Sequence, residues 1–201
     1  MSADPPPRLN LFLLRDFLDL HTCASLTAEL DSSSATQAPV YLLGSPGLVH
    51  EDVRKTTSLH PSDETISQIH DLLLRQKSSL EDHFDQSLTD CERPQFLRYR
   101  EGDFFVRHRD GNTEQLEFDH LKIRRISIVA FLNGSSREPV AGGFCGGALN
   151  FYGPEGAAPP ESAGFSLHGE TGLLVAFAAE TLHEVLPVTH GERFTIISWF
   201  R

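Results

Sequence analysis

QFLRYREGDFFVRHRDG, at residues 95–111, holds two short apolar runs separated by the turn-forming residues Glu-Gly-Asp. Phe and Tyr favour extended backbone, and a run of about five such residues bounded by turn residues is typical of a β-strand. The stretch therefore predicts one strand at 96–99 and another at 104–108. The same alternation of short apolar runs and turns continues from here to residue 201.

The second half of the chain is predicted to be all β. Of the 14 Phe residues, 11 lie after residue 95. We expect strands at 96–99, 104–108, 125–132, 149–152, 165–167, 173–177, 183–185 and 194–200. The glycine-rich GGFCGG at 142–147 is predicted to be a loop. Consecutive short strands without intervening helices favour a β-sandwich or jelly roll over a parallel α/β sheet.

The first half has a different pattern. TCASLTAEL at 22–30 predicts a short helix, and residues 40–43 predict a strand that ends in a GSPG turn. Apolar residues recur every three or four positions from Ser62 to Phe84, which predicts one long amphipathic helix. We therefore expect a single domain over 1–201. Its residues 1–94 form a mainly helical support region that packs on one outer face of the β region, 95–201.

Composition narrows the possible partners. The chain has 17 basic and 28 acidic residues and a net charge of −11, which argues against a nucleic-acid partner. No run of 18 apolar residues predicts a membrane span, and the N-terminus lacks the pattern of a signal peptide. The three cysteines form no CxxC pair. A cytoplasmic protein is the simplest expectation.

Four His-x-acid pairs are candidates for metal binding, but with ten histidines and 28 acids the pattern alone has little specificity. Side chains at i and i+2 point the same way only on extended backbone. His83-x-Asp85 falls on the predicted helix, and His50-x-Asp52 falls in a charged stretch. His108-x-Asp110 ends a predicted strand, and so does its one serious competitor, His168-x-Glu170.

The residues that follow favour His108 and Asp110. A mononuclear non-haem iron site uses two imidazoles and one carboxylate and leaves three coordination positions open. His183 begins a predicted strand 75 residues after His108, and Arg193 opens the last strand. A guanidinium there is suited to binding a carboxylate through two parallel hydrogen bonds. The ordered set His108, Asp110, His183 and Arg193 is far more specific than its parts.

These residues resemble the iron(II)- and 2-oxoglutarate-dependent dioxygenases of the prolyl 4-hydroxylase family, and within it the hypoxia-inducible-factor prolyl hydroxylases. The similarity is carried by RDFLDLHTCASLTAEL at 15–30, FVRHRDG at 105–111, SIVAFLN at 127–133, GGALNFYGPEG at 146–156, and LHEVLPV with ERFTIISWF within 182–200. It implies a double-stranded β-helix (jelly-roll) core with N-terminal helices packed on one face.

The resemblance also implies roles for individual residues. His108, Asp110 and His183 would hold Fe(II), and Arg193 would pair with the far carboxylate of 2-oxoglutarate. Tyr99 would hydrogen-bond the same carboxylate. Ascorbate is expected to stimulate the reaction.

Three further residues concern specificity. Phe131 is a departure, because the hypoxia-factor enzymes carry a tyrosine at the matching position, and one hydrogen bond to the cosubstrate is thereby lost. Trp199 matches an aromatic residue that lies near the substrate proline in those enzymes. Arg125 belongs to the most positive segment of the chain, 98–125, and is a candidate substrate contact.

The implied activity is hydroxylation of a C–H bond, coupled to the decarboxylation of 2-oxoglutarate to succinate and CO2. The expected substrate is a prolyl residue in a peptide or protein. The alternatives are a hydroxylase of a free amino acid or small metabolite, and a non-catalytic metal-binding β-sandwich. The segments 111–122, expected to be a substrate loop, and 135–147 would decide between the two enzymatic readings. Neither the oligomeric state nor a redox role for Cys145 follows from the sequence.

Overall fold

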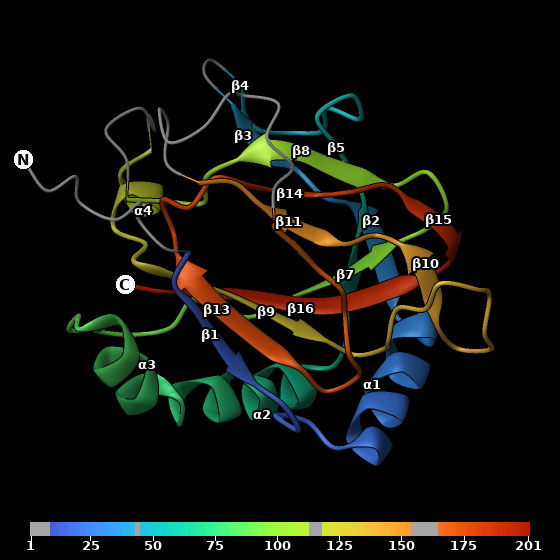
Figure 1. The fold of residues 1–201 in the computed structure, drawn as a ribbon, viewed down its shortest axis with the longest axis horizontal. Helices are drawn as coiled ribbons and strands as arrows, with labels where there is room; N and C mark the ends of the chain where they lie inside the picture. The colour runs from blue at the N-terminus through green and yellow to red at the C-terminus, as the bar shows by residue number, and fades with distance from the viewer. Residues whose placement is uncertain (1–8, 43–44, 113–117, 154–164) are drawn as a thin grey trace, which may run out of the picture.

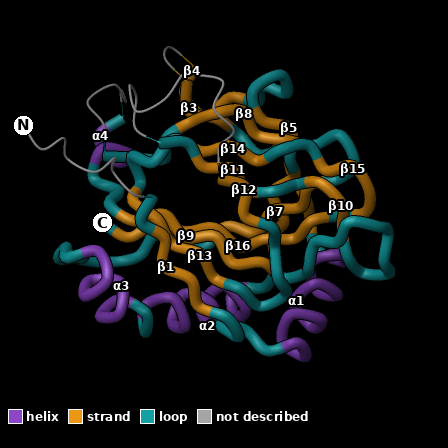
Figure 2. The backbone as a smooth tube through the Cα atoms, in the orientation of Figure 1, coloured by secondary structure: helices purple, strands orange, loops and turns teal. Residues whose placement is uncertain are grey.

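The computed structural model describes residues 9–42, 45–112, 118–153 and 165–201. Two antiparallel sheets face each other, and helices cover the outer face of the larger one (Figure 1). The backbone tube shows the same three layers of helices, large sheet and small sheet (Figure 2). The predicted mainly β fold with a jelly-roll core and helices on one face is confirmed.

The larger sheet has seven strands in the order β1-β13-β9-β16-β7-β6-β2, and every neighbouring pair is antiparallel. Its strands are β1 (Leu11–Leu14), β13 (Leu174–Ala178), β9 (Ile126–Phe131), β16 (Arg193–Phe200), β7 (Gln95–Tyr99), β6 (Thr57–His60) and β2 (Ser34–Gln37).

The smaller sheet has five strands in the order β12-β11-β14-β8-β5, also antiparallel. They are β12 (Phe165–Leu167), β11 (Leu149–Phe151), β14 (His183–Val185), β8 (Phe104–His108) and β5 (Arg54–Lys55). Two isolated pairs join β10 (Phe144–Gly146) to β15 (Val188–Gly191), and β3 (Val40–Leu42) to β4 (Ser45–Leu48).

All eight strands predicted after residue 95 are present, and those at 104–108, 165–167 and 183–185 have the predicted bounds. The predicted loop at 142–147 is wrong, because β10 lies within it. Gly146 has a φ of 70°, and a Cβ there would lie 2.5 Å from the Pro187 carbonyl oxygen. The glycines thus permit a bulged, closely packed strand pair rather than a free loop.

The N-terminal half contains strands that the helical pattern did not predict. Among the described residues, six strands, β1 to β6, precede residue 94. β3 lies within the strand predicted at 40–43, whereas β1, β2 and β6 are unpredicted strands of the larger sheet. The description of 1–94 as mainly helical is therefore incomplete. β2, with the sequence SATQ, is exposed throughout at the sheet edge, so no apolar alternation marks it. The predicted GSPG turn lies partly outside the described residues, and its last three residues begin β4.

The helices are α1 (Leu20–Ser32), α2 (Asp63–Leu74), α3 (Lys77–Phe84) and the short α4 (Asp119–Lys122). The Ser62 hydroxyl caps α2 by accepting a hydrogen bond from the Thr65 N–H at 3.2 Å. The prediction of one helix over 62–84 is wrong, since the chain turns between Leu74 and Lys77. No apolar residue lies between Leu74 and Leu80, so this turn has nothing to bury against the sheet. No helix of the described residues has the length and apolarity needed to cross a membrane.

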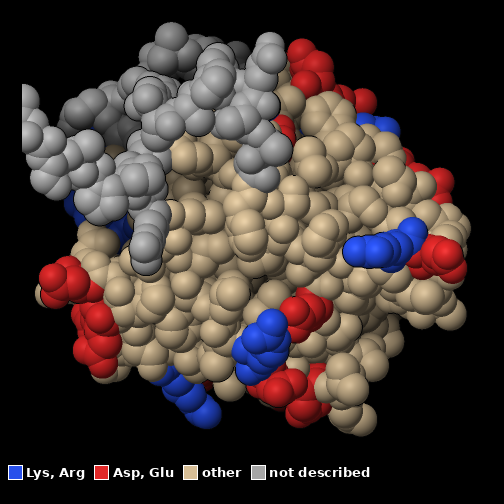
Figure 3. Space-filling model, in the orientation of Figure 1, with Lys and Arg blue, Asp and Glu red and all other residues tan. Residues whose placement is uncertain are grey.

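The surface is acidic, in keeping with the net charge of −11. One face carries few charged side chains across its centre, and both acidic and basic side chains lie toward its edges (Figure 3).

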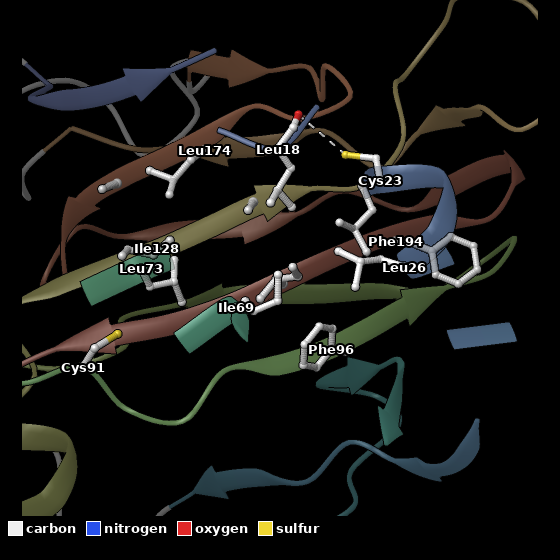
Figure 4. Close-up of a cluster of buried hydrophobic side chains, with 14 of the residues drawn as sticks. Leu18, Cys23, Leu26, Ile69, Leu73, Cys91, Phe96, Ile128, Leu174 and Phe194 are labelled. Carbon is white, nitrogen blue, oxygen red and sulfur yellow. Dashed lines mark hydrogen bonds between the residues drawn. The ribbon is translucent and has the colours of Figure 1, made fainter. Parts of the chain in front are cut away.

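Two apolar clusters lie on opposite faces of the larger sheet. Strand β9 contributes to both, because its side chains alternate: Ile126 and Ile128 face the helices, whereas Val129 and Phe131 face the smaller sheet. The helix-side cluster is shown in Figure 4, where Leu26 of α1 and Ile69 and Leu73 of α2 pack over the sheet. The helices thus support the sheet from outside and leave its inner face for the site.

Candidate active site

Two strands of the smaller sheet bring the predicted histidines together. β8 and β14 pair so that His108 lies directly opposite His183, and the two ring centres are 4.2 Å apart. Asp110 follows β8, and its backbone N–H donates a 2.9 Å hydrogen bond to the Ala179 carbonyl. Residues 75 positions apart in the chain thereby share one surface.

The three side chains form a compact cluster of donor atoms. His108 Nε2 lies 3.4 Å from Asp110 Oδ1, and His183 Nε2 lies 3.7 Å from Asp110 Oδ2. The three donor atoms lie within 4.8 Å of one another. Within the described part of the chain, no other group of three His, Cys, Asp or Glu side chains has metal-binding spacing.

Both histidines are oriented by their own backbone. His108 Nδ1 lies 2.8 Å from the Val106 carbonyl oxygen, and His183 Nδ1 lies 2.8 Å from the Thr181 carbonyl oxygen. A carbonyl only accepts, so each Nδ1 must carry the proton, and in the neutral ring Nε2 then has the free lone pair. Both rings are therefore set to bind a metal through Nε2, the atom that faces Asp110.

Protonation states also suit a metal. Burial alone would raise the pKa of Asp110, but interactions with His183 and His108 outweigh it and hold that pKa below its ordinary value. Burial, reinforced by His108, lowers the pKa of His183 to about 4. The Ser127 hydroxyl adds a 2.7 Å hydrogen bond to Asp110 Oδ2. At neutral pH the cluster thus offers an ionised carboxylate and a neutral His183 imidazole, the forms that bind metals.

A buried arginine faces this cluster from the larger sheet. Arg193 of β16 lies opposite Tyr99 of β7 in the strand pair and is 1% exposed. Its guanidinium carbon is 5.0 Å from the Tyr99 ring centre and 4.9 Å from that of Phe131. Burial lowers the pKa of Arg193 to about 10, so the side chain remains charged at neutral pH.

This guanidinium has no anionic partner among the described residues. Its Nη1 donates a 3.3 Å hydrogen bond to the Thr195 hydroxyl, and its Nε is buried with no hydrogen-bond partner in the described part of the chain. Burying an unpaired charge costs roughly several kcal/mol of free energy, and a bound carboxylate ligand would offset this cost. The orphaned Nε fits the predicted role in binding a dicarboxylate.

Phe131 stands where the resemblance would place a tyrosine. It is fully buried beneath Arg193, and Gly169 gives it room, because a Cβ at Gly169 would lie 2.5 Å from Phe131 Cδ1. Phe131 therefore presents a ring face to the guanidinium and offers no hydroxyl. Tyr99, 2% exposed and next to Arg193, brings a phenolic hydroxyl to this wall, beside the aliphatic hydroxyl of Thr195.

A cavity of about 770 Å³ lies between the sheets. His108, Asp110 and His183 form part of its wall on the smaller sheet, and Tyr99 and Arg193 part of its wall on the larger sheet. The donor set fits Fe(II), because two imidazoles and one carboxylate leave positions open for other ligands.

Trp199 lines the same cavity and is held by residues that the sequence did not single out. The Arg124 guanidinium carbon lies 3.6 Å from the Trp199 ring centre. Arg124 donates to both Glu92 carboxylate oxygens, at 2.9 and 2.7 Å, and to the Asp110 carbonyl at 3.3 Å. The buried Trp199 N–H favours the ionised form of the Asp110 carboxylate and so helps to lower its pKa.

Arg125 is not among the residues that line the cavity. It donates to Asn112 Oδ1 at 2.6 Å and to the Lys122 carbonyl at 2.9 Å. Arg125 thus links Asn112 and Lys122, which lie at opposite ends of the segment 111–122. Residues 113–117 of the expected substrate loop lie outside the described residues, and 119–122 form α4.

The competing His-x-acid pair lies elsewhere. Glu170 pairs with Arg15 at 2.9 Å, and His168 is exposed. His83 Nε2 is 2.9 Å from Asn10 Oδ1. The pairing of β8 with β14 therefore distinguishes His108 and Asp110 from the other His-x-acid pairs, because it places His183 beside them. The sequence motif alone does not reveal this pairing.

Comparison with known proteins agrees with this site. A family model described as the 2OG-Fe(II) oxygenase superfamily matches residues 94–201, which include all four predicted site residues. None of the curated proteins matches the chain at a significant level.

Solved structures share the fold at low identity. A prolyl-4-hydroxylase from Pseudomonas putida is 24% identical, with 96% of this chain and 92% of that chain covered and a TM-score of 0.65. A prolyl hydroxylase from Trichoplax adhaerens, in complex with a hypoxia inducible factor oxygen degradation domain peptide fragment, is 17% identical, with 95% and 83% covered and a TM-score of 0.66. The viral collagen prolyl hydroxylase of Paramecium Bursaria Chlorella virus-1, in its 2OG complex, is 19% identical, with 96% of each chain covered and a TM-score of 0.61.

Proposed function

Because this chain belongs to the 2OG-Fe(II) oxygenase superfamily, we propose that it hydroxylates a prolyl residue within a peptide or protein. The chain is a 2-oxoglutarate-dependent dioxygenase. In the coupled reaction, one atom of O2 enters a C–H bond of the substrate and the other enters the succinate formed as 2-oxoglutarate loses CO2.

The shape of the cavity supports a peptide substrate. Thr195, Leu97, Ser58 and Thr36 lie opposite one another in successive strand pairs, from β16 through β7 and β6 to β2. All four line the cavity. Four neighbouring strands span about 14 Å, roughly the length of four extended residues and more than a free amino acid needs. This row, leading from the centre of the sheet to its edge strand, is the observation that carries the proposal.

The protein's own residues bind, orient and shield the reactants. His108, Asp110 and His183 would hold Fe(II), and the bound metal would supply the oxidising chemistry with O2 and 2-oxoglutarate. Arg193 would bind the far carboxylate of 2-oxoglutarate, and the Tyr99 hydroxyl would donate a hydrogen bond to the same group. The buried apolar residues between the sheets exclude water from this end of the cavity.

Similar structures give independent support. The proteins named above are prolyl hydroxylases, and one is bound to a peptide fragment. We propose ascorbate as a stimulant, because it would keep the iron in its ferrous state. A reducing compartment such as the cytoplasm suits the chain, because Cys23, Cys91 and Cys145 are all free and buried.

Substrate turnover tests the proposal. Purified protein with Fe(II), ascorbate and 2-oxoglutarate would be challenged with capped proline-containing peptides and, separately, with free proline and other amino acids. We expect succinate release and the mass gain of one oxygen on a peptide proline. His183→Ala should reduce both to background. His168→Ala, the same change in the exposed look-alike motif, should leave both unchanged.

Oxidation of free amino acids alone would contradict a peptide substrate. Equal turnover by the wild-type protein and His183→Ala would contradict the assignment of the site.

A further inference from the structure

A second arginine in the cavity lacks a counter-ion. Arg54 of β5 is 8% exposed and lines the cavity. Its Nη1 donates to the Pro39 carbonyl at 3.1 Å, but its Nε is buried with no hydrogen-bond partner in the described part of the chain. The adjacent Lys55 pairs with Asp103 at 3.5 Å, whereas no described carboxylate pairs with Arg54. The side chain therefore carries an uncompensated charge at the cavity wall.

Arg54 lies close to the metal ligands. β5 and β8 pair so that Arg54 is opposite Phe105. The guanidinium carbon is 4.9 Å from the Phe105 ring centre, and this ring stacks on His108 with centres 3.5 Å apart and planes 17° from parallel. A single aromatic ring thus separates the guanidinium of Arg54 from the imidazole of His108.

The other arginines of the cavity wall each have a polar partner or a proposed ligand. Six arginines and two aspartates line it, so the wall is positive in a protein of net charge −11. Three arginines lie beside acids: Arg93 with Asp63 at 2.5 Å, Arg124 with Glu92 at 2.7 Å, and Arg107 with Glu184 at 3.9 Å. Arg109 donates to the Glu180 carbonyl. Arg193 is assigned to 2-oxoglutarate, which leaves Arg54 available for a second anion.

We infer that Arg54 forms a subsite for a carboxylate of the peptide substrate. A carboxylate would engage the unused N–H groups through charge-assisted hydrogen bonds and neutralise the buried charge. Because the guanidinium carbon is 4.9 Å from the Phe105 ring centre and that centre is 3.5 Å from the His108 ring centre, Arg54 lies within about 8 Å of the His108 ring. An extended peptide advances about 3.3 Å per residue, so the carboxylate belongs two or three residues from the hydroxylated position. This inference rests on the proposed function and adds an acidic residue to the substrate that it names.

Paired peptides test the subsite in the wild-type protein. Capped peptides with one proline would carry a single Glu at each position from four before to four after the proline, each matched by a Gln peptide. We expect KM to be about tenfold lower for Glu than for Gln at one or two neighbouring positions. Repeating the series with a free C-terminus distinguishes a side-chain carboxylate from a terminal one.

Variants assign the preference to Arg54. Arg54→Gln should abolish the difference between Glu and Gln peptides while KM for 2-oxoglutarate stays unchanged, and Arg54→Lys should keep part of it. Arg93→Gln is the matched control, because it removes the same charge from the cavity wall at an already paired position. It should keep the full preference.

The subsite is overturned if every Glu and Gln pair has the same KM in the wild-type protein, which requires no variant to fold. It is also overturned if Arg54→Gln keeps the preference or raises KM for 2-oxoglutarate. In each of these cases peptide hydroxylation persists and the proposed function stands. Turnover of free amino acids without peptides would instead refute the proposed function.

Discussion

Arg193 brings a positive charge into a region where the chain provides no described acid beside it. The neighbouring backbone is shaped around this side chain, because a Cβ at Gly147 would lie 3.0 Å from Arg193 Cδ. Tyr99 and Phe131 flank the guanidinium with their ring faces. Such an arrangement holds the charge in one place and leaves it for a ligand.

Replacing Arg193 should separate cosubstrate binding from metal binding. We expect Arg193→Met to raise KM for 2-oxoglutarate by about 100-fold, because a charge-assisted contact is lost. Mn(II) affinity should change less than about threefold, since the proposed metal ligands lie on the smaller sheet or directly after its strand β8. Succinate release against 2-oxoglutarate concentration, together with a Mn(II) titration, measures both. Loss of Mn(II) binding in this variant would show that the role of Arg193 is wrongly assigned.

The sequence indicates a functional role for some residues of the site and not for others. His108, Asp110, His183 and Arg193 stand in motifs whose order is specific, so the sequence alone singles them out as candidates, and the structure brings the first three together. Arg54 escapes such reasoning, because its importance comes from a contact with Phe105 that depends on pairing of the two-residue strand β5. Arg125 is the predicted substrate contact, but its neighbour Arg124 is the one that lines the cavity. Two adjacent arginines in a sequence do not show which of them faces a cavity.

At the level of elements, the segment before β7 and the segment before β9 are joined by one ion pair. Glu92 accepts two hydrogen bonds from Arg124, which also contacts the Trp199 ring and the Asp110 carbonyl. Arg124 is 8% exposed, so this pair is shielded from solvent. Through Arg124 it contacts both Asp110, a proposed metal ligand, and the Trp199 ring, so we expect it to position the two together.

Breaking this pair should weaken the metal site without removing a ligand. We expect Glu92→Gln to lower Mn(II) affinity by about tenfold, as loss of support behind a metal ligand does. Trp199 is the only tryptophan in the chain, so its fluorescence reports on the same site and should also change. Lys77→Gln, which breaks the Lys77–Glu81 pair in α3, is the control and should alter neither. Unchanged Mn(II) affinity in Glu92→Gln would rule out the positioning role.

Elements can be predicted where apolar runs end at turn residues. β8, with Glu-Gly-Asp before it and Asp110-Gly111 after it, has the predicted bounds for this reason. β2 and β10 escape prediction because one is polar and exposed and the other is rich in glycine, so neither shows alternation. The register that sets His108 opposite His183 is a property of the assembled sheet and cannot be read from either strand alone.

On the scale of the whole molecule, the site depends on two sheets meeting face to face. The smaller sheet and the turn after β8 supply the proposed metal ligands, the smaller sheet also supplies Arg54, and the larger sheet supplies Arg193, Tyr99 and the row that leads to its edge. The helices α1, α2 and α3 stabilise the larger sheet from its outer face, so its inner face is left for the cavity. An acidic molecule thereby encloses a cavity whose wall is positive, suited to anionic ligands.

The proposed activity depends most on the convergence of His108, Asp110 and His183 on one metal ion. A titration with Mn(II), followed by the electron paramagnetic resonance signal of the free ion, measures this directly. We predict one tightly bound Mn(II) per chain in the wild-type protein, and at least about 100-fold weaker binding in Asp110→Ala and in His183→Ala. Glu170→Ala, in the look-alike motif, should bind as the wild type does. Retention of the tight site in Asp110→Ala or His183→Ala would contradict the account.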